Sequence, residues 1–71
     1  MPARAMNNFE KTTAKVLKSA GFTIFWEDHH RTAGEYWAIH PALVFQYALS
    51  DGVDLPLKHL LKKKAIQLSL F

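Results

Sequence analysis

The chain contains no cysteine in its 71 residues, which excludes disulfide bonds, thiolate metal sites and thiol nucleophiles. It has no apolar run near the roughly 20 residues that span a bilayer, and its first eight residues lack the apolar region of a signal peptide. It also lacks a glycine-rich phosphate loop, a Gly-x-Ser-x-Gly pattern and paired catalytic carboxylates. We therefore expect a cytoplasmic protein with no membrane contact, no cofactor and no metal.

Apolar and aromatic residues are abundant instead. They make up 49% and 13% of the chain, which argues against disorder. A chain of this length forms a single domain, here residues 1–71, and leaves some of its aromatic rings near the surface. Such rings favour a face that binds a partner or forms a homodimer. The net charge of +3 favours a polyanionic partner.

Residues 21–41 predict a β-hairpin. Residues 22–26 and 36–39 are rich in β-branched and aromatic side chains, which suit strands. Alternation places Phe22, Ile24 and Trp26 on one face and Thr23, Phe25 and Glu27 on the other. Gly34, at the end of the polar connection, is predicted to have a positive φ. Because both faces carry aromatic rings, either both are covered or one contacts a partner.

A helix is predicted before the hairpin. Asn7 and Glu10 have the spacing of a capping box, and Gly21 ends the helix. The predicted buried face consists of Phe9, Thr13, Val16, Leu17 and Ala20. The opposite side presents Lys11, Lys15 and Lys18, as a solvated face or as phosphate contacts. Residues 1–6 show no periodicity and are expected to be a loose leader.

The segment after the hairpin has two interpretations. In residues 43–49, Leu43, Phe45, Tyr47 and Leu49 alternate with smaller or polar residues, which predicts a third strand. Pro41 would equally suit the first position of a helix that ends near Gly52. That alternative forms a helix-turn-helix with the last helix. We predict the strand.

A C-terminal helix is predicted from Asp54, which can cap it, with Pro56 in its first turn. Its apolar face is expected to comprise Leu57, Leu60, Leu61, Ala65 and Leu68. Its lysines, Lys58, Lys62 and Lys63, lie on the outer side, and Lys64 lies near its C-terminal end. The predicted fold class is α+β: helix, hairpin, possible third antiparallel strand and helix, with αββαα as the alternative.

Two groups of side chains are candidates for function. The predicted nucleic-acid contacts are Lys11, Lys15, Lys18, Arg31, Lys58, Lys62 and Lys63. The predicted partner-docking residues are Phe25, Trp26, Tyr36 and Trp37, and the last three could also stack on bases. His29 and His30, beside Asp28, could supply a general base for an RNA 2′-hydroxyl or form a polar hairpin tip.

Several short segments resemble the HicA family of toxins, whose fold is similar to the double-stranded-RNA-binding domain. They are VLKSAGF at residues 16–22, RTAG at 31–34 followed by His40-Pro41, and Asp54-Leu55-Pro56 before LLKKKAI at 60–66. The resemblance implies the predicted order of helices and strands. It also implies descent from an mRNA-cleaving enzyme.

The catalytic motif of that family is absent. Its Gly-Ser-His motif, whose histidine is assigned to catalysis, corresponds here to Gly34-Glu35-Tyr36. Only His29 or His30 could replace the histidine. The resemblance therefore implies a binding derivative of the scaffold and not a working ribonuclease.

Three functions remain as hypotheses. The first is a non-catalytic regulator that binds nucleic acid, RNA in preference to DNA, in a phage, plasmid or toxin–antitoxin context. The second is a phage-type inhibitor that binds a host protein or defence complex through its aromatic hairpin or apolar tail. The third is an active HicA-like toxin that uses His29 or His30.

Overall fold

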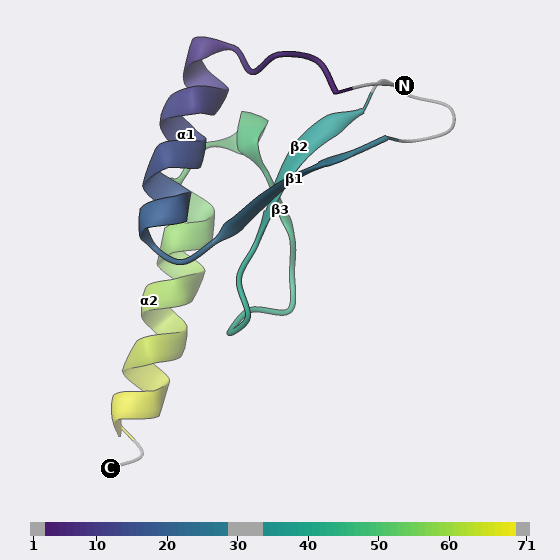
Figure 1. Ribbon diagram of the computed structural model, residues 1–71. Coiled ribbons are helices and arrows are strands. Elements are labelled where there is room, and N and C mark those ends of the chain that lie inside the picture. Colours follow the sequence, from purple (N-terminus) through teal and green to yellow (C-terminus); the bar gives the residue numbers. More distant parts are fainter. Residues whose placement is uncertain (1–2, 29–33, 70–71) are drawn as a thin grey trace.

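The computed structural model describes residues 3–28 and 34–69, with side chains as far as residue 66. The elements come in the order α1 (Asn8–Ser19), β1 (Thr23–Glu27), β2 (Glu35–Ile39), β3 (Tyr47–Ala48), the 3₁₀ turn η1 (Leu49–Asp51) and α2 (Asp54–Ser69). Both helices lie on the same side of the sheet (Figure 1). The predicted α+β class is confirmed.

The sheet has the order β1-β2-β3 and is antiparallel throughout. Phe25 pairs with Trp37, and Trp26 pairs with Tyr36. Because directly paired residues share a face of the sheet, Phe25 and Trp26 lie on opposite faces, as their alternation predicts. The third strand exists, but only as Tyr47–Ala48. Residues 41–46 form turns and bends, and the amides of Ala42 and Leu43 donate to Nδ1 and the carbonyl of His40. The helical alternative for this segment, and with it αββαα, is wrong.

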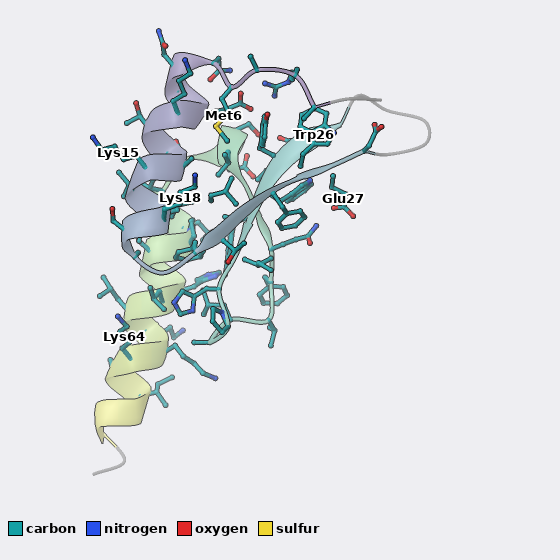
Figure 2. All side chains as sticks on the ribbon, viewed as in Figure 1. Met6, Lys15, Lys18, Trp26, Glu27 and Lys64 are labelled. Atoms are coloured by element: carbon teal, nitrogen blue, oxygen red, sulfur yellow. The ribbon has the colours of Figure 1, made fainter. Side chains whose placement is uncertain are left out.

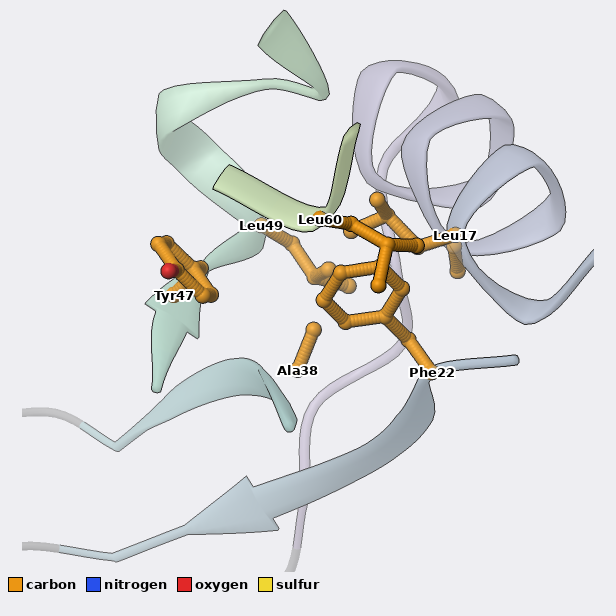
Figure 3. Close-up of a cluster of buried hydrophobic side chains, with 7 residues drawn as sticks. Leu17, Phe22, Ala38, Tyr47, Leu49 and Leu60 are labelled. Carbon is orange, nitrogen blue, oxygen red and sulfur yellow. The ribbon is translucent and has the colours of Figure 1, made fainter. Parts of the chain in front are cut away.

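The core lies between the helices and the sheet. Side chains of Leu17 and Leu60 on the two helices meet the Phe22 ring above Ala38 (Figure 3). Tyr47 closes the cluster from β3, with its ring edge-on to Phe22 at 6.3 Å between centroids. Because Ala38 is small and central, it leaves room for the aromatic ring that ties β1 to the helices.

Helix α1 begins and ends as predicted, but it buries a different stripe. Asn7 Oδ1 accepts from the Glu10 amide at 2.8 Å, and Glu10 Oε1 accepts from the Asn7 amide at 3.0 Å, which completes the capping box. Gly21 stops the helix with φ +96°. Glu10, Thr13, Ala14 and Leu17 are buried. Phe9 and Val16 are exposed, so the predicted apolar face was placed too far around the helix.

The described part of the expected leader, from residue 3 onward, is in fact held against the domain. The Arg4 guanidinium makes two 2.6 Å hydrogen bonds to the Glu10 carboxylate, which is only 1% exposed. It also lies 5.7 Å from the ring centroids of Trp26 and Tyr36. The Tyr36 hydroxyl donates to the Arg4 carbonyl, and Met6 packs against the core. A buried carboxylate needs such a partner, which periodicity does not reveal.

Gly34 does not have the positive φ that the sequence led us to expect; Gly21 and Gly52 do. Its role is close approach. A Cβ at Gly34 would lie 2.3 Å from Cζ2 of Trp26, a distance that no side chain tolerates. The glycine therefore makes room for the indole ring at the far end of the hairpin.

Helix α2 is packed over only part of its length. Pro56 and Leu60 are buried, whereas every residue from 61 to 66 is exposed. In Figure 1 the helix continues beyond the sheet. The positions that continue the stripe of Leu60 at helical spacing are Lys63, Lys64 and Gln67. Among the described residues, no helix has the length and apolar character needed to cross a membrane.

Candidate binding surfaces

The lysines are gathered on the two helices. All seven lysines of the chain are exposed helix residues: Lys11, Lys15 and Lys18 on α1, and Lys58, Lys62, Lys63 and Lys64 on α2. Figure 2 shows Lys15, Lys18 and Lys64 on the helical side, while Trp26 and Glu27 lie on the hairpin, away from the helices. The predicted lysine contacts therefore share one layer of the molecule. Arg31 lies outside the described residues.

The α1 lysines occupy one flank of their helix. The other flank, with Phe9, Thr12 and Val16, lines a cavity together with residues 51–54, which lead from η1 into α2. Helix α2 in turn lies over β3, because its His59 contacts Tyr47. The flank with Lys11, Lys15 and Lys18 is therefore turned away from the start of α2, and Figure 2 shows Lys15 on the side of α1 away from the sheet.

Three of the six described carboxylates, those of Glu27, Asp28 and Glu35, lie on the hairpin, and those of Glu10, Asp51 and Asp54 lie on or beside the helices. Glu10 is bound by Arg4, and this hydrogen-bonded ion pair holds the pKa of the Glu10 carboxyl below its ordinary value although burial opposes the shift. Glu27 and Glu35 face each other across the hairpin and accept hydrogen bonds from Gln46 and Ser50, respectively. The lysines are thus confined to the helices, whereas the described carboxylates are divided between the helices and the hairpin.

The four predicted docking residues do not form one surface. Phe25 and Trp37 pair on the open face of the sheet, whereas Trp26 and Tyr36 pair on the helical face. The rings of the second pair meet edge-on at 4.9 Å and lie beneath Arg4. All four side chains are half-buried, so the predicted docking residues are divided between two faces of the sheet.

An apolar groove adjoins the open face, and the sequence did not predict it. It has a volume of about 710 Å³ and is lined by Thr23, Ile39, His40, Pro41 and residues 43–46. Val44 and Phe45 are 91% and 65% exposed. The signal was present in the alternation of residues 43–49, which we assigned to a long strand. Strand pairing ends at Tyr47, so the preceding apolar residues have no sheet to cover.

The described histidines have structural contacts. His40 Nδ1 accepts from the Ala42 amide at 3.0 Å, and its ring packs edge-on against Phe22. His59 Nδ1 lies 2.6 Å from the hydroxyl of Tyr47, and burial raises the pKa of that hydroxyl. His29 and His30 lie outside the described residues. Within the described ranges, no three potential metal ligands come together.

Comparisons of this chain with protein-family models, with curated proteins and with solved structures gave no match. The HicA resemblance therefore stays a prediction, and the candidate surfaces are defined by the geometry of this chain alone.

Proposed function

We propose that this protein is a small, non-catalytic nucleic-acid-binding regulator that contacts the phosphate backbone through its two helices. The observation behind this proposal is that all seven lysines are exposed on the helical layer. Lysine ammonium groups bind phosphates as flexible point charges and release condensed counterions when they do so. The anionic end of the hairpin would point away from the polyanion.

RNA is the preferred partner in this proposal, on the strength of the family resemblance. The position of the family's catalytic histidine is occupied by Tyr36, whose hydroxyl donates to the Arg4 carbonyl and whose ring packs on Trp26. Tyr36 thus has a structural use. We therefore propose binding without cleavage.

The test is fluorescence anisotropy with labelled RNA duplex, single-stranded RNA and DNA duplex over a series of salt concentrations. Affinity is expected to fall linearly with salt on logarithmic axes, with a slope of roughly 0.7 to 0.9 per phosphate contact. Affinity that does not change with salt would contradict the proposal.

Two matched variants locate the contact surface. One replaces Lys11, Lys15 and Lys18 with Gln, and the other replaces Lys58, Lys62 and Lys63 with Gln, so both remove the same number of charges. A larger loss of affinity and of salt slope in one variant identifies the helix that contacts phosphate. Equal small losses in both would indicate that only net charge acts, and would reject a defined surface.

A second candidate function, a protein inhibitor, is favoured by the exposed Val44 and Phe45, which line the apolar groove together with Thr23 and Ile39. Surfaces of this kind are typical of protein contacts. A tagged pull-down from bacterial lysate, with and without nuclease, tests it. The inhibitor hypothesis is supported if one protein is retained at near-equal stoichiometry with and without nuclease and is lost with the Phe45→Ser variant. If nuclease treatment removes the recovered protein, the inhibitor hypothesis is rejected.

A further inference from the structure

A cavity lies between α2 and the connection from β2 to β3, which run next to each other in Figure 1. Its volume is about 240 Å³, below the roughly 300–1,000 Å³ of sites for drug-sized ligands. It is lined by residues 42–45 of the connection and by Tyr47, His59 and Lys63. The cavity therefore has the size and the mixed lining of a site for a small ligand with an apolar and a polar end.

The apolar wall of this cavity is fixed by His40 and by the core. The amides of Ala42 and Leu43 donate to Nδ1 and to the carbonyl of His40, both at 3.0 Å. Both side chains also pack against the hydrophobic core. Val44 and Phe45 follow them and are exposed. A wall that is already in place costs a ligand little ordering when it binds.

The wall formed by α2 presents a hydrogen-bond donor. The hydroxyl of the buried Tyr47 lies 2.6 Å from Nδ1 of His59. A buried hydroxyl needs an acceptor for its proton, and among the described residues Nδ1 is the acceptor within reach. Burial also raises the pKa of this hydroxyl, which keeps it protonated. The neutral His59 ring then carries its own proton on Nε2, on the side of the ring away from Tyr47.

Lys63 adds a positive charge to the same wall. It follows His59 by four positions in α2, a spacing that makes two side chains neighbours on a helix. His59 is half-buried and Lys63 is exposed, which places the charge toward the solvent end of the cavity. None of the described residues that line the cavity carries a carboxylate. Two donors, one of them cationic, thus face an apolar wall.

We propose that this cavity binds a small monocarboxylate with an apolar body, such as a short fatty acid or an aryl carboxylate. One carboxylate oxygen would accept from Nε2 of His59, and the other would accept from the Lys63 ammonium group, both in charge-assisted hydrogen bonds. The apolar body would lie along residues 42–45 and be removed from water there. Tyr47 is a positioning residue, because its hydroxyl sets the tautomer of His59.

The same lining disfavours three other kinds of ligand. An amine would bring a second positive charge next to Lys63, and like charges repel. A neutral apolar molecule would cover the Nε2 proton of His59 without offering an acceptor. A nucleotide could place a phosphate on Lys63, but the apolar side chains of residues 42–45 would leave the polar edges of its base without partners.

The test is a ligand titration followed by NMR, with the resonances of Val44, Phe45 and the His59 ring as the readout. Hexanoate is the probe. Hexylammonium, hexanol and acetate are matched controls, because they reverse the charge, remove the charge and remove the apolar body, respectively. We expect hexanoate to bind with a dissociation constant of about millimolar order, and each control to bind about fivefold more weakly or less. Equal binding of any control, binding away from these residues, or no binding of hexanoate would overturn the proposal.

Two lysine variants distinguish this site from a general effect of charge. Lys63→Gln removes the ammonium group at the cavity, and Lys64→Gln removes the neighbouring charge, which is not among the lining residues. Both side chains are exposed, so both variants should fold. Lys63→Gln should weaken hexanoate about fivefold, and Lys64→Gln less than about twofold. Equal losses in the two variants would overturn the proposal.

The role of Tyr47 has its own readout. Nitrogen chemical shifts of the neutral His59 ring should show the proton on Nε2, and Tyr47→Phe should remove this preference and weaken hexanoate. A proton on Nδ1 in the unmodified protein would overturn the arrangement.

This inference does not rest on the proposed function. Hexanoate binding without RNA binding rejects the proposed function alone, and RNA binding without hexanoate binding rejects this inference alone. Uridine monophosphate is titrated as well. If it shifted the same resonances at lower concentration than hexanoate, the cavity would be a nucleic-acid contact and the inference would be rejected.

Discussion

The two helices show how differently one amphipathic pattern can be used. Helix α1 buries a stripe from Glu10 to Leu17 and is held at both ends, by its capping box and by Gly21. Helix α2 is longer, yet it buries only Pro56 and Leu60 among the residues whose side chains are described. Beyond Leu60 it leaves the sheet.

The difference lies in what each helix has to cover. A small sheet with a two-residue third strand offers one short apolar surface, which α1 and the first turns of α2 fill. At the next turns of α2, lysines occupy the inward stripe, so packing ends there. Helical periodicity specifies which residues share a face, but not how long the opposing surface is.

The largest effect is expected in α1. Leu17 is fully buried in the contact among both helices and Phe22. Leu17→Ala should lower the free energy of unfolding by about 2–5 kcal/mol, because it removes transfer energy and leaves a cavity. Urea unfolding followed by circular dichroism measures this. A loss below that of the Leu61→Ala control would show that the packing of α1 is not the main source of stability.

The next effect concerns the Glu10 carboxylate and pH. Since Arg4 lowers the pKa of Glu10 in the folded protein, the stabilisation is complete above the ordinary carboxyl pKa of about 4.3. It is lost as the pH falls through the lower, folded value. Across this acid range, the free energy of unfolding should therefore fall more steeply with decreasing pH in the unmodified protein than in Glu10→Gln. Urea unfolding at a series of pH values measures this. Identical pH profiles would mean that the ion pair adds no stability.

A smaller effect is expected at the cap of α1. Asn7→Ala removes the side-chain acceptor for the Glu10 amide and should lower the free energy of unfolding by about 1 kcal/mol. Asn7→Asp, which keeps an acceptor and suits the helix dipole, is the matched control and should retain stability. Equal losses in both variants would contradict a capping role.

The smallest effect is expected in the second half of α2. Leu61 is 66% exposed, so Leu61→Ala should change stability by about 0.5 kcal/mol or less. Thermal unfolding at low and high protein concentration provides the measurement. A clear loss, especially one that depends on concentration, would reveal that a contact covers this part of α2 in solution.

The local features of the fold were predictable from the sequence. Asn7, Glu10 and Gly21 predict the ends of α1 through short-range rules, and alternation predicts which hairpin residues share a face. Features set by long-range contacts were missed. Arg4 reaches Trp26 and Tyr36 across the chain, and the third strand is short because residues 41–46 turn away from the sheet.

The candidate surfaces were predictable to the same extent. Lysine spacing indicated two exposed basic faces, and all seven lysines are exposed on the helices. Sequence could not show that Trp26 and Tyr36 are covered by Arg4 while Phe25 and Trp37 lie on the other face. That division depends on the contact made by the N-terminal segment, which has no periodic signal.

The placement of the two tryptophans also provides the protein with its own optical reporters. Trp26 lies under Arg4 on the helical face, and Trp37 lies opposite Phe25 on the open face. In a variant that keeps only Trp37, tryptophan fluorescence would report on the open face. In one that keeps only Trp26, it would report on the helical face. Each surface can thus be followed separately by fluorescence, without attaching a dye to either.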